Sequence, residues 1–161
     1  MKSALFCFLM VACTSCVSVE LGPKHPARAV GVRYTPPPKP FTKASADNVD
    51  EIWRNSKNGN AISFLSECND PADPSLHGIE QGVLSGLYPY TYIAQDDITY
   101  ESRAARRVQV KGIVDGVPSL VDLLVFKRNN CIYILSYVGL EQQHKRDQKS
   151  FEDFISGFHA P

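Results

Sequence analysis

Residues 117–139 read VPSLVDLLVFKRNNCIYILSYVG and contain two apolar runs joined by a polar turn. The runs, 117–126 and 131–139, barely alternate between apolar and polar residues, which is typical of strands buried on both faces. Their β-branched and aromatic content, with an Asn-Asn turn between them, favours strands over helix. The stretch therefore predicts a hairpin at the centre of the fold. Asp122 interrupts the first strand, and we interpret it as an edge contact or a paired side chain, with a site residue as the alternative.

Further strands are predicted on the N-terminal side of this hairpin. Residues 50–55 and 61–66 flank an Asn-Gly pair, which is a strong hairpin signal. Residues 91–100 form the next predicted strand. In residues 104–114 valines alternate with polar residues, and an Asp-Gly turn then leads into the central hairpin. The single tryptophan, Trp53, is expected to pack in the core.

Two helices complete the predicted fold. The first covers about residues 74–87, with Asp73 as its N-cap and a proline as its first residue. The second lies within 147–158 and carries an apolar stripe of Phe151, Phe154, Ile155 and Phe158. The expected fold class is α+β, with an antiparallel sheet of about five to six strands packed against a helix after the first hairpin and a C-terminal helix.

Charge and motifs limit the classes of function. The chain has 161 residues with 17 Lys plus Arg and 17 Asp plus Glu, so its formal net charge is zero, which argues against a nucleic-acid partner. None of the common catalytic or nucleotide-binding motifs occurs, and no two of the four histidines have metal-ligand spacing. We therefore expect no enzyme, no cofactor and no metal, and we assign no catalytic residue.

The N-terminus has the features of an export signal. A lysine at position 2 precedes an uncharged run at 3–13, which is too short to span a bilayer but has the length of a signal-peptide core. Small residues before a cysteine then resemble the lipobox of bacterial lipoproteins. The resemblance implies a cysteine that carries acyl chains and anchors the protein to a membrane. An ordinary secretory signal is the alternative.

Two cysteines compete for lipidation. Cys13 fits the lipobox better residue by residue, whereas Cys16 gives a signal of normal length, and we favour Cys16. The expected organisation is a signal peptide at 1–15, a Pro-rich tether at 16–46 and a globular domain at 47–161. Neither cysteine precedes an Asp, which by resemblance to the sorting rule of enteric bacteria suggests an outer-membrane lipoprotein facing the periplasm.

Two further features concern the globular part. Cys68 follows the second strand and Cys131 begins the last one, so in an exported protein we predict a disulfide between them, with two separate buried thiols as the alternative. Tyr88, Tyr90 and Tyr92 are two residues apart and would share one face of an extended segment. Core packing is the ordinary interpretation, and an aromatic binding surface is the hypothesis we retain.

The order of elements and the closing motif YVGL…FEDFISGF resemble the fold of the photosystem protein PsbP and the nuclear import factor Mog. The motifs GNAISFLSEC, VDGVPSLVDLLVF and CIYILSYVG are similar to a group of uncharacterised bacterial lipoproteins over residues 47–161. The resemblance implies proteins that bind partners or assist assembly. We therefore expect an interaction or assembly module with an envelope protein partner, and the alternative is a lipoprotein that binds a small ligand between sheet and helix.

Overall fold

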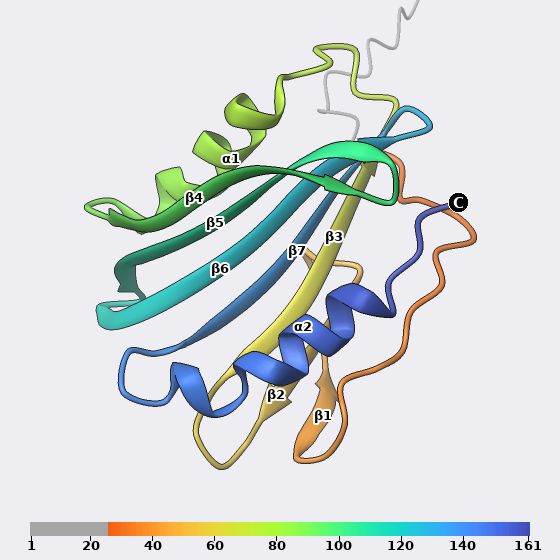
Figure 1. Ribbon diagram of the computed structural model, residues 1–161. Helices are drawn as coiled ribbons and strands as arrows, with labels where there is room; N and C mark the ends of the chain where they lie inside the picture. The colour runs from red at the N-terminus through yellow and green to blue at the C-terminus, as the bar shows by residue number, and fades with distance from the viewer. Residues whose placement is uncertain (1–25) are drawn as a thin grey trace, which may run out of the picture.

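An antiparallel sheet of seven strands runs through residues 26–161, the part of the chain that the computed structural model describes (Figure 1). The strands lie in the order β1-β2-β3-β7-β6-β5-β4. Their bounds are β1 Phe41–Ala44, β2 Glu51–Asn55, β3 Ala61–Cys68, β4 Thr91–Tyr100, β5 Arg103–Val114, β6 Val117–Arg128 and β7 Cys131–Leu140. The predicted α+β class is confirmed, with one strand more than the upper expected count.

The hairpin of β6 and β7 lies inside the sheet, because β7 pairs with β3 on its other side and β6 pairs with β5. Both strands are mostly buried. Successive residues point to opposite faces: Leu123 belongs to one apolar cluster, and Leu124 belongs to the other. The near-continuous apolar pattern of this hairpin follows from a sheet that is covered on both faces.

Each face of the sheet carries one helix (Figure 1). The first helix, α1 (Leu76–Leu84), continues into a short 3-10 turn, η1 (Ser85–Leu87), and packs Ile79 and Leu84 on the face of Leu123. The second, α2 (Gln148–Ser156), lies on the opposite face. Both predicted helices are present. The first begins later than expected, because the side chain of Ser75 accepts a hydrogen bond from Gly78 N, whereas Asp73 bonds to Lys127.

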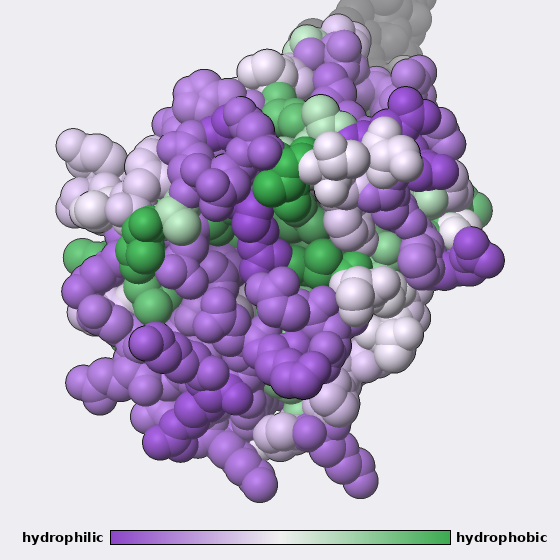
Figure 2. Space-filling view, in the orientation of Figure 1, coloured by the Kyte–Doolittle hydropathy of each residue, from purple (hydrophilic) through white to green (hydrophobic). Residues whose placement is uncertain are grey.

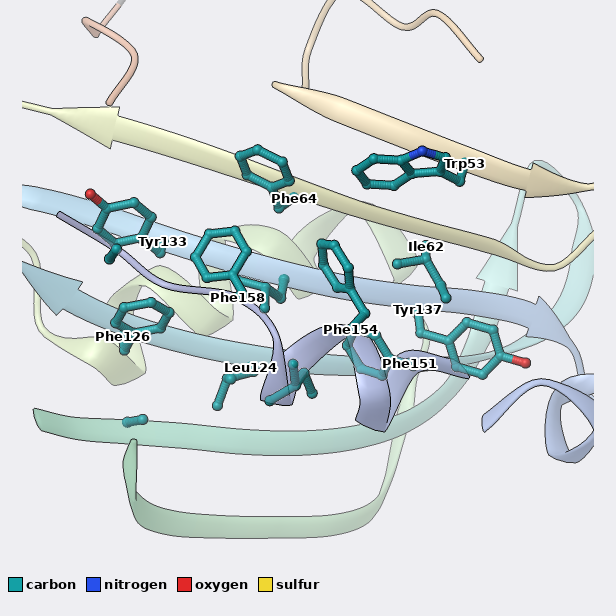
Figure 3. Packing of buried hydrophobic residues seen from close by; sticks show 14 of the residues in the cluster. Trp53, Ile62, Phe64, Leu124, Phe126, Tyr133, Tyr137, Phe151, Phe154 and Phe158 are labelled. Carbon is teal, nitrogen blue, oxygen red and sulfur yellow. The ribbon is translucent and has the colours of Figure 1, made fainter. Parts of the chain in front are cut away.

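The phenylalanines of the C-terminal segment fill the core beneath α2. Phe158 packs against Phe64, with ring centroids 5.1 Å apart, and Phe126 stacks on Tyr133 at 5.0 Å (Figure 3). Phe154 reaches Trp53 at 5.5 Å, so the tryptophan is a core residue as predicted. Burying each such side chain contributes roughly 1.5–3 kcal/mol before entropy. This burial explains how so short a helix is held in place.

The described part of the expected tether, residues 26–46, packs against the sheet instead of extending freely. Ala27 forms a bridge with Cys68, and Arg33 forms one with His159. The ring of Tyr34 lies 5.1 Å from that of Phe64. The chain then adds β1, which pairs with β2 and is the strand that the sequence analysis missed. The Pro-rich run ends just before β1, and Phe41, the first residue of β1, is buried. Apolar contacts with the sheet therefore outweigh the preference of this segment for a free, extended conformation.

Candidate functional site

A small cavity of about 220 Å³ lies between the sheet and α2. Its walls come from β4, β5 and α2, and the central strand β6 supplies one residue. The lining residues are Ala94, Asp96, Arg107, Val108, Gln109, Asp122, Gln148 and Glu152. Three of these side chains are carboxylates and one is a guanidinium, so the cavity is polar and acidic.

Asp122 is the lining residue that comes from β6, and only 2% of it is exposed. Gln109, its partner across the β5–β6 pair, donates a hydrogen bond from Nε2 to Oδ1 at 2.8 Å. His144, which is 1% exposed, places Nε2 at 3.1 Å from Oδ2 without hydrogen-bond alignment. Asp122 is therefore a paired side chain, which was one of the two ordinary interpretations of this interruption.

The backbone of His144 is part of a buried polar network. Tyr137 donates a hydrogen bond to the His144 carbonyl oxygen at 2.5 Å and accepts one from Asn60 Nδ2 at 2.8 Å. Burial raises the pKa of Tyr137 well above its ordinary value, chiefly through desolvation. Asp147 Oδ2 accepts hydrogen bonds from three side-chain amides, those of Asn55, Asn58 and Asn60. The network ties the β2–β3 turn to the connection between β7 and α2.

The sequence contained no signal that brings Asp122 and His144 together, because 22 positions separate them and neither belongs to a motif. The pair combines an acid with a base, as many catalytic sites do. However, only Asp122 lines the cavity, and His144 does not. With both side chains almost fully buried, their first effect is to attach the segment after β7 to the sheet. Among residues 26–161 no group of three potential metal ligands occurs.

The structure places the three candidate tyrosines in different surroundings. Tyr88 is 82% exposed and precedes β4, whereas Tyr90 and Tyr92 bond to α1. Tyr92 donates to Glu80 Oε1 at 2.5 Å, and burial followed by this hydrogen bond raises the pKa of Tyr92. Glu80 is fully buried and also pairs with Arg106. Tyr92 thus bonds directly to the buried ion pair, and Tyr90, which bonds to Gln81, meets the Tyr92 ring edge to face at 5.6 Å.

A cluster of exposed apolar side chains lies where β5 turns into β6 and where β7 ends. We call it the rim patch, and it consists of Ile113, Val117, Pro118 and Leu140. Strand pairing places Ile113 beside Pro118 on the α2 face of the sheet, and Leu140 beside Ser119, two residues after Val117, on the α1 face, so the patch wraps around the end of the sheet. Pro118 and Leu140 line a hollow of about 360 Å³ with residues 141–143. Figure 2 shows a mostly hydrophilic surface on which hydrophobic residues appear in several separate areas.

The predicted disulfide is confirmed. Cys68 and Cys131 are bonded and lie directly opposite one another in the β3–β7 pair. Cys13, Cys16 and the expected signal peptide lie outside the described residues. Within residues 26–161, no helix combines the length and the apolar character that crossing a membrane requires.

No protein-family model matches the chain, and no curated protein matches it. Solved structures do. The cyanobacterial PsbP, CyanoP, from Synechocystis sp. PCC 6803 superposes with a TM-score of 0.57 at 12% identity, over 89% of this chain and 96% of that one. LpqN of Mycobacterium tuberculosis, described as involved in cell envelope biogenesis, superposes with a TM-score of 0.56 at 11% identity, over 81% and 83%.

These superpositions define the fold as PsbP-like. The part of the expected resemblance that concerns PsbP is therefore confirmed at the level of the fold. Identities of 11% and 12% carry no functional residue across, since one fold serves many functions.

Proposed function

We propose that this protein is a membrane-anchored lipoprotein of the bacterial envelope, facing the periplasm, that acts by binding another envelope protein and not by catalysis. The anchor is the acylated cysteine, Cys16 or Cys13, and the binding surface is the rim patch.

The rim patch is the observation that carries this proposal. Val117 is 43% exposed and Leu140 is 42% exposed, and they lie at the first residue of β6 and the last residue of β7. Single exposed apolar residues are common, but a cluster beside a hollow and surrounded by polar residues is typical of a surface that binds another protein. Glu141 and Gln142, in the wall of the hollow, provide such a polar border.

The environment of the acid–base pair supports a role without catalysis. A general base must reach the proton that it removes. His144 is buried, its Nε2 faces Asp122, and the lining of the cavity between sheet and α2 does not include it. His144, the base of the pair, therefore lacks access to a substrate through this cavity.

Three observations support a location in the envelope. The N-terminal run resembles a lipoprotein signal, and the fold is shared with LpqN, which is described as involved in cell envelope biogenesis. The disulfide between Cys68 and Cys131 also suits an oxidising compartment.

The test is site-specific photocrosslinking in cells of the source bacterium. A crosslinking amino acid in place of Leu140 should yield one discrete adduct with an envelope protein. Val117→Glu should abolish this adduct, whereas Val30→Glu, the same change at a residue that is 90% exposed and belongs to the N-terminal segment, should leave it intact. Both variants should keep the free energy of unfolding within about 0.5 kcal/mol of the wild type. The proposal is wrong if Leu140 yields no adduct or if the two variants behave alike.

The alternative function, a small ligand held between sheet and helix, is favoured by the cavity beside Asp122. Its volume of about 220 Å³ is below the roughly 300–1,000 Å³ of most ligand sites, and its walls are polar instead of apolar. A ligand there would be small and hydrophilic. Native mass spectrometry of the protein purified from its own cells would reveal such a molecule as a discrete added mass, and loss of that mass in Asp122→Asn would locate it.

A further inference from the structure

β4 is the long free edge of the sheet. It pairs with β5 alone, so its outer row of N–H and C=O groups has no strand partner among the described residues. Nine of its ten residues are exposed, and Figure 1 shows the strand along the border of the sheet. The opposite edge strand, β1, has only four residues. An exposed edge strand of this length is a template on which an extended segment adds a further strand.

Exposed edge strands are usually kept from pairing with other chains by bulges and charged side chains, and in β4 these features cover only part of the strand. A bulge between Tyr92 and Ala94 interrupts its first part. From Ala94 to Tyr100 the pairing with β5 is continuous, which leaves seven residues for a segment of ordinary strand length. Of the two central charges, Asp97 is already paired with Arg106 at 2.7 Å.

Asp96 is the charge that indicates the chemistry of a partner. It stands opposite Arg107 in the β4–β5 pair, but the guanidinium of Arg107 bonds to Glu152 at 2.7 Å and lies over the Phe151 ring at 4.8 Å. Within residues 26–161 Asp96 has no ion-pair partner. It lines the acidic cavity together with Asp122 and Glu152, so this face of β4 favours a cation and repels an anion.

The residues on either side of Asp96 indicate which other side chains a partner strand would carry. Ala94 and Ile98 lie two residues before and after Asp96, and Ile98 is 39% exposed. They therefore share the face of Asp96. Side chains of an added strand lie about 4.5–5.5 Å from their partners on that face, a distance that a lysine side chain crosses easily.

We propose that the edge of β4 over residues 94–100 binds an extended peptide segment of a partner protein, in which a lysine faces Asp96 and apolar residues on either side of it face Ala94 and Ile98. The added strand would be held by backbone hydrogen bonds, and the lysine would select the register. This inference rests on the binding role proposed above and assigns it a second surface and a partner chemistry.

The test uses the purified full chain and the capped peptide Thr-Val-Thr-Lys-Thr-Val-Thr. NMR titration should shift the amide signals of residues 94–100 and leave those of Val117 and Leu140 unmoved. A peptide with Glu in place of Lys should bind at least about tenfold more weakly. Methylation of alternate backbone nitrogens, which removes their N–H donors, should abolish binding. Raising salt from about 50 mM to about 300 mM should weaken binding of the lysine peptide.

Variants of the protein complete the test. Asp96→Asn should remove the preference for Lys over Glu, whereas Asp115→Asn, the same change in the exposed β5–β6 turn, should preserve it. The proposal is overturned if the Lys and Glu peptides bind the wild-type protein equally, if the shifts map to the rim patch, or if no shift appears at about 5 mM peptide. Since this assay needs no cell envelope, its failure is distinguishable from failure of the crosslinking at Leu140.

Discussion

Gly139 shows how closely single residues are fitted around the candidate site. A Cβ at this position would overlap the side-chain oxygen of Asn60, which belongs to the network with Tyr137 and Asp147. We predict that Gly139→Ala lowers the free energy of unfolding by about 2 kcal/mol, because overpacking displaces a hydrogen-bonded side chain.

Urea denaturation measures this effect, and Gly82→Ala is the matched control. A Cβ at Gly82 meets nothing within 4 Å, and the residue lies inside α1, so the same change should raise stability by up to about 1 kcal/mol. Equal effects at the two glycines would contradict the close approach at Gly139.

Asp122 is the buried side chain that links the sheet to the segment after β7. Asp122→Ala would leave His144 and Gln109 without their buried partner, and we predict a loss of about 3 kcal/mol in the free energy of unfolding. Asp153→Ala, which removes an exposed carboxylate paired with Lys149, should cost less than about 0.5 kcal/mol. If both variants unfold at the same urea concentration, the pair between Asp122 and His144 contributes no stability.

We predict that Tyr100 makes the free energy of unfolding depend on pH in the alkaline range. Its hydroxyl donates to the carbonyl oxygens of Ile155 and Phe158, and burial, with a smaller effect of Glu101, raises its pKa above the ordinary value of about 10. Between the unfolded and the folded pKa, the folded chain holds a proton that the unfolded chain has lost. Stability therefore falls as pH rises above about 10, and Tyr100 adds no pH dependence below it.

Tyr100→Phe should lower stability near neutral pH by about 1 kcal/mol through the lost hydrogen bond. It should also make the decline above about pH 10 shallower than in the wild type. Urea titrations of both proteins at several pH values between about 8 and 11 measure the difference. Parallel curves for the two proteins would show that Tyr100 is not responsible.

At the scale of elements, the disulfide joins two strands that are neighbours in the sheet but distant in the chain. Cys68 and Cys131 are 63 positions apart. By the chain-entropy model, replacing both with Ala should cost about 4 kcal/mol, because the unfolded chain gains the freedom of that loop. Thermal unfolding of the double variant and of the reduced wild type should show similar losses. A double variant as stable as the oxidised protein would contradict this prediction.

The elements also show which local patterns can be read from sequence. The strands of the central hairpin were predicted from their near-continuous apolar runs, and the C-terminal helix was predicted from its periodic apolar stripe. The Asn-Gly pair placed the turn between β2 and β3. β1 was missed, since four residues after a Pro-rich segment carry no period and become a strand only by pairing with β2.

At the scale of the whole molecule, the position of the anchor decides how the domain is presented. If Cys16 is acylated, eleven positions separate it from Ala27, which is already bonded to Cys68 at the sheet. Such a stretch spans at most about 40 Å when fully extended, so the domain would stay close to its membrane.

We predict that mass spectrometry of the mature N-terminus finds acyl chains on Cys16. Cys16→Ala should release the protein from membranes, since one or more buried chains supply the attachment. Acylation at Cys13 would move the anchor by three residues and would still agree with a lipid anchor. Unmodified Cys13 and Cys16 in the membrane fraction would refute the lipid anchor.

The sequence by itself determined the α+β class, the central hairpin, the aromatic stripe of α2 and the pairing of Cys68 with Cys131. The first three depend on local apolar pattern and composition, which a strand or helix imposes on its own residues, whereas the cysteine pairing was predicted from the expected export of a chain with two cysteines in its globular part. Only the tertiary structure decided that the Pro-rich segment packs on the sheet, that Asp122 meets His144 and that Glu80 meets Arg106. Each of these contacts joins residues far apart in the chain. The strand order, the register and the placement of the helices bring these residues together, and no local sequence pattern encodes that arrangement.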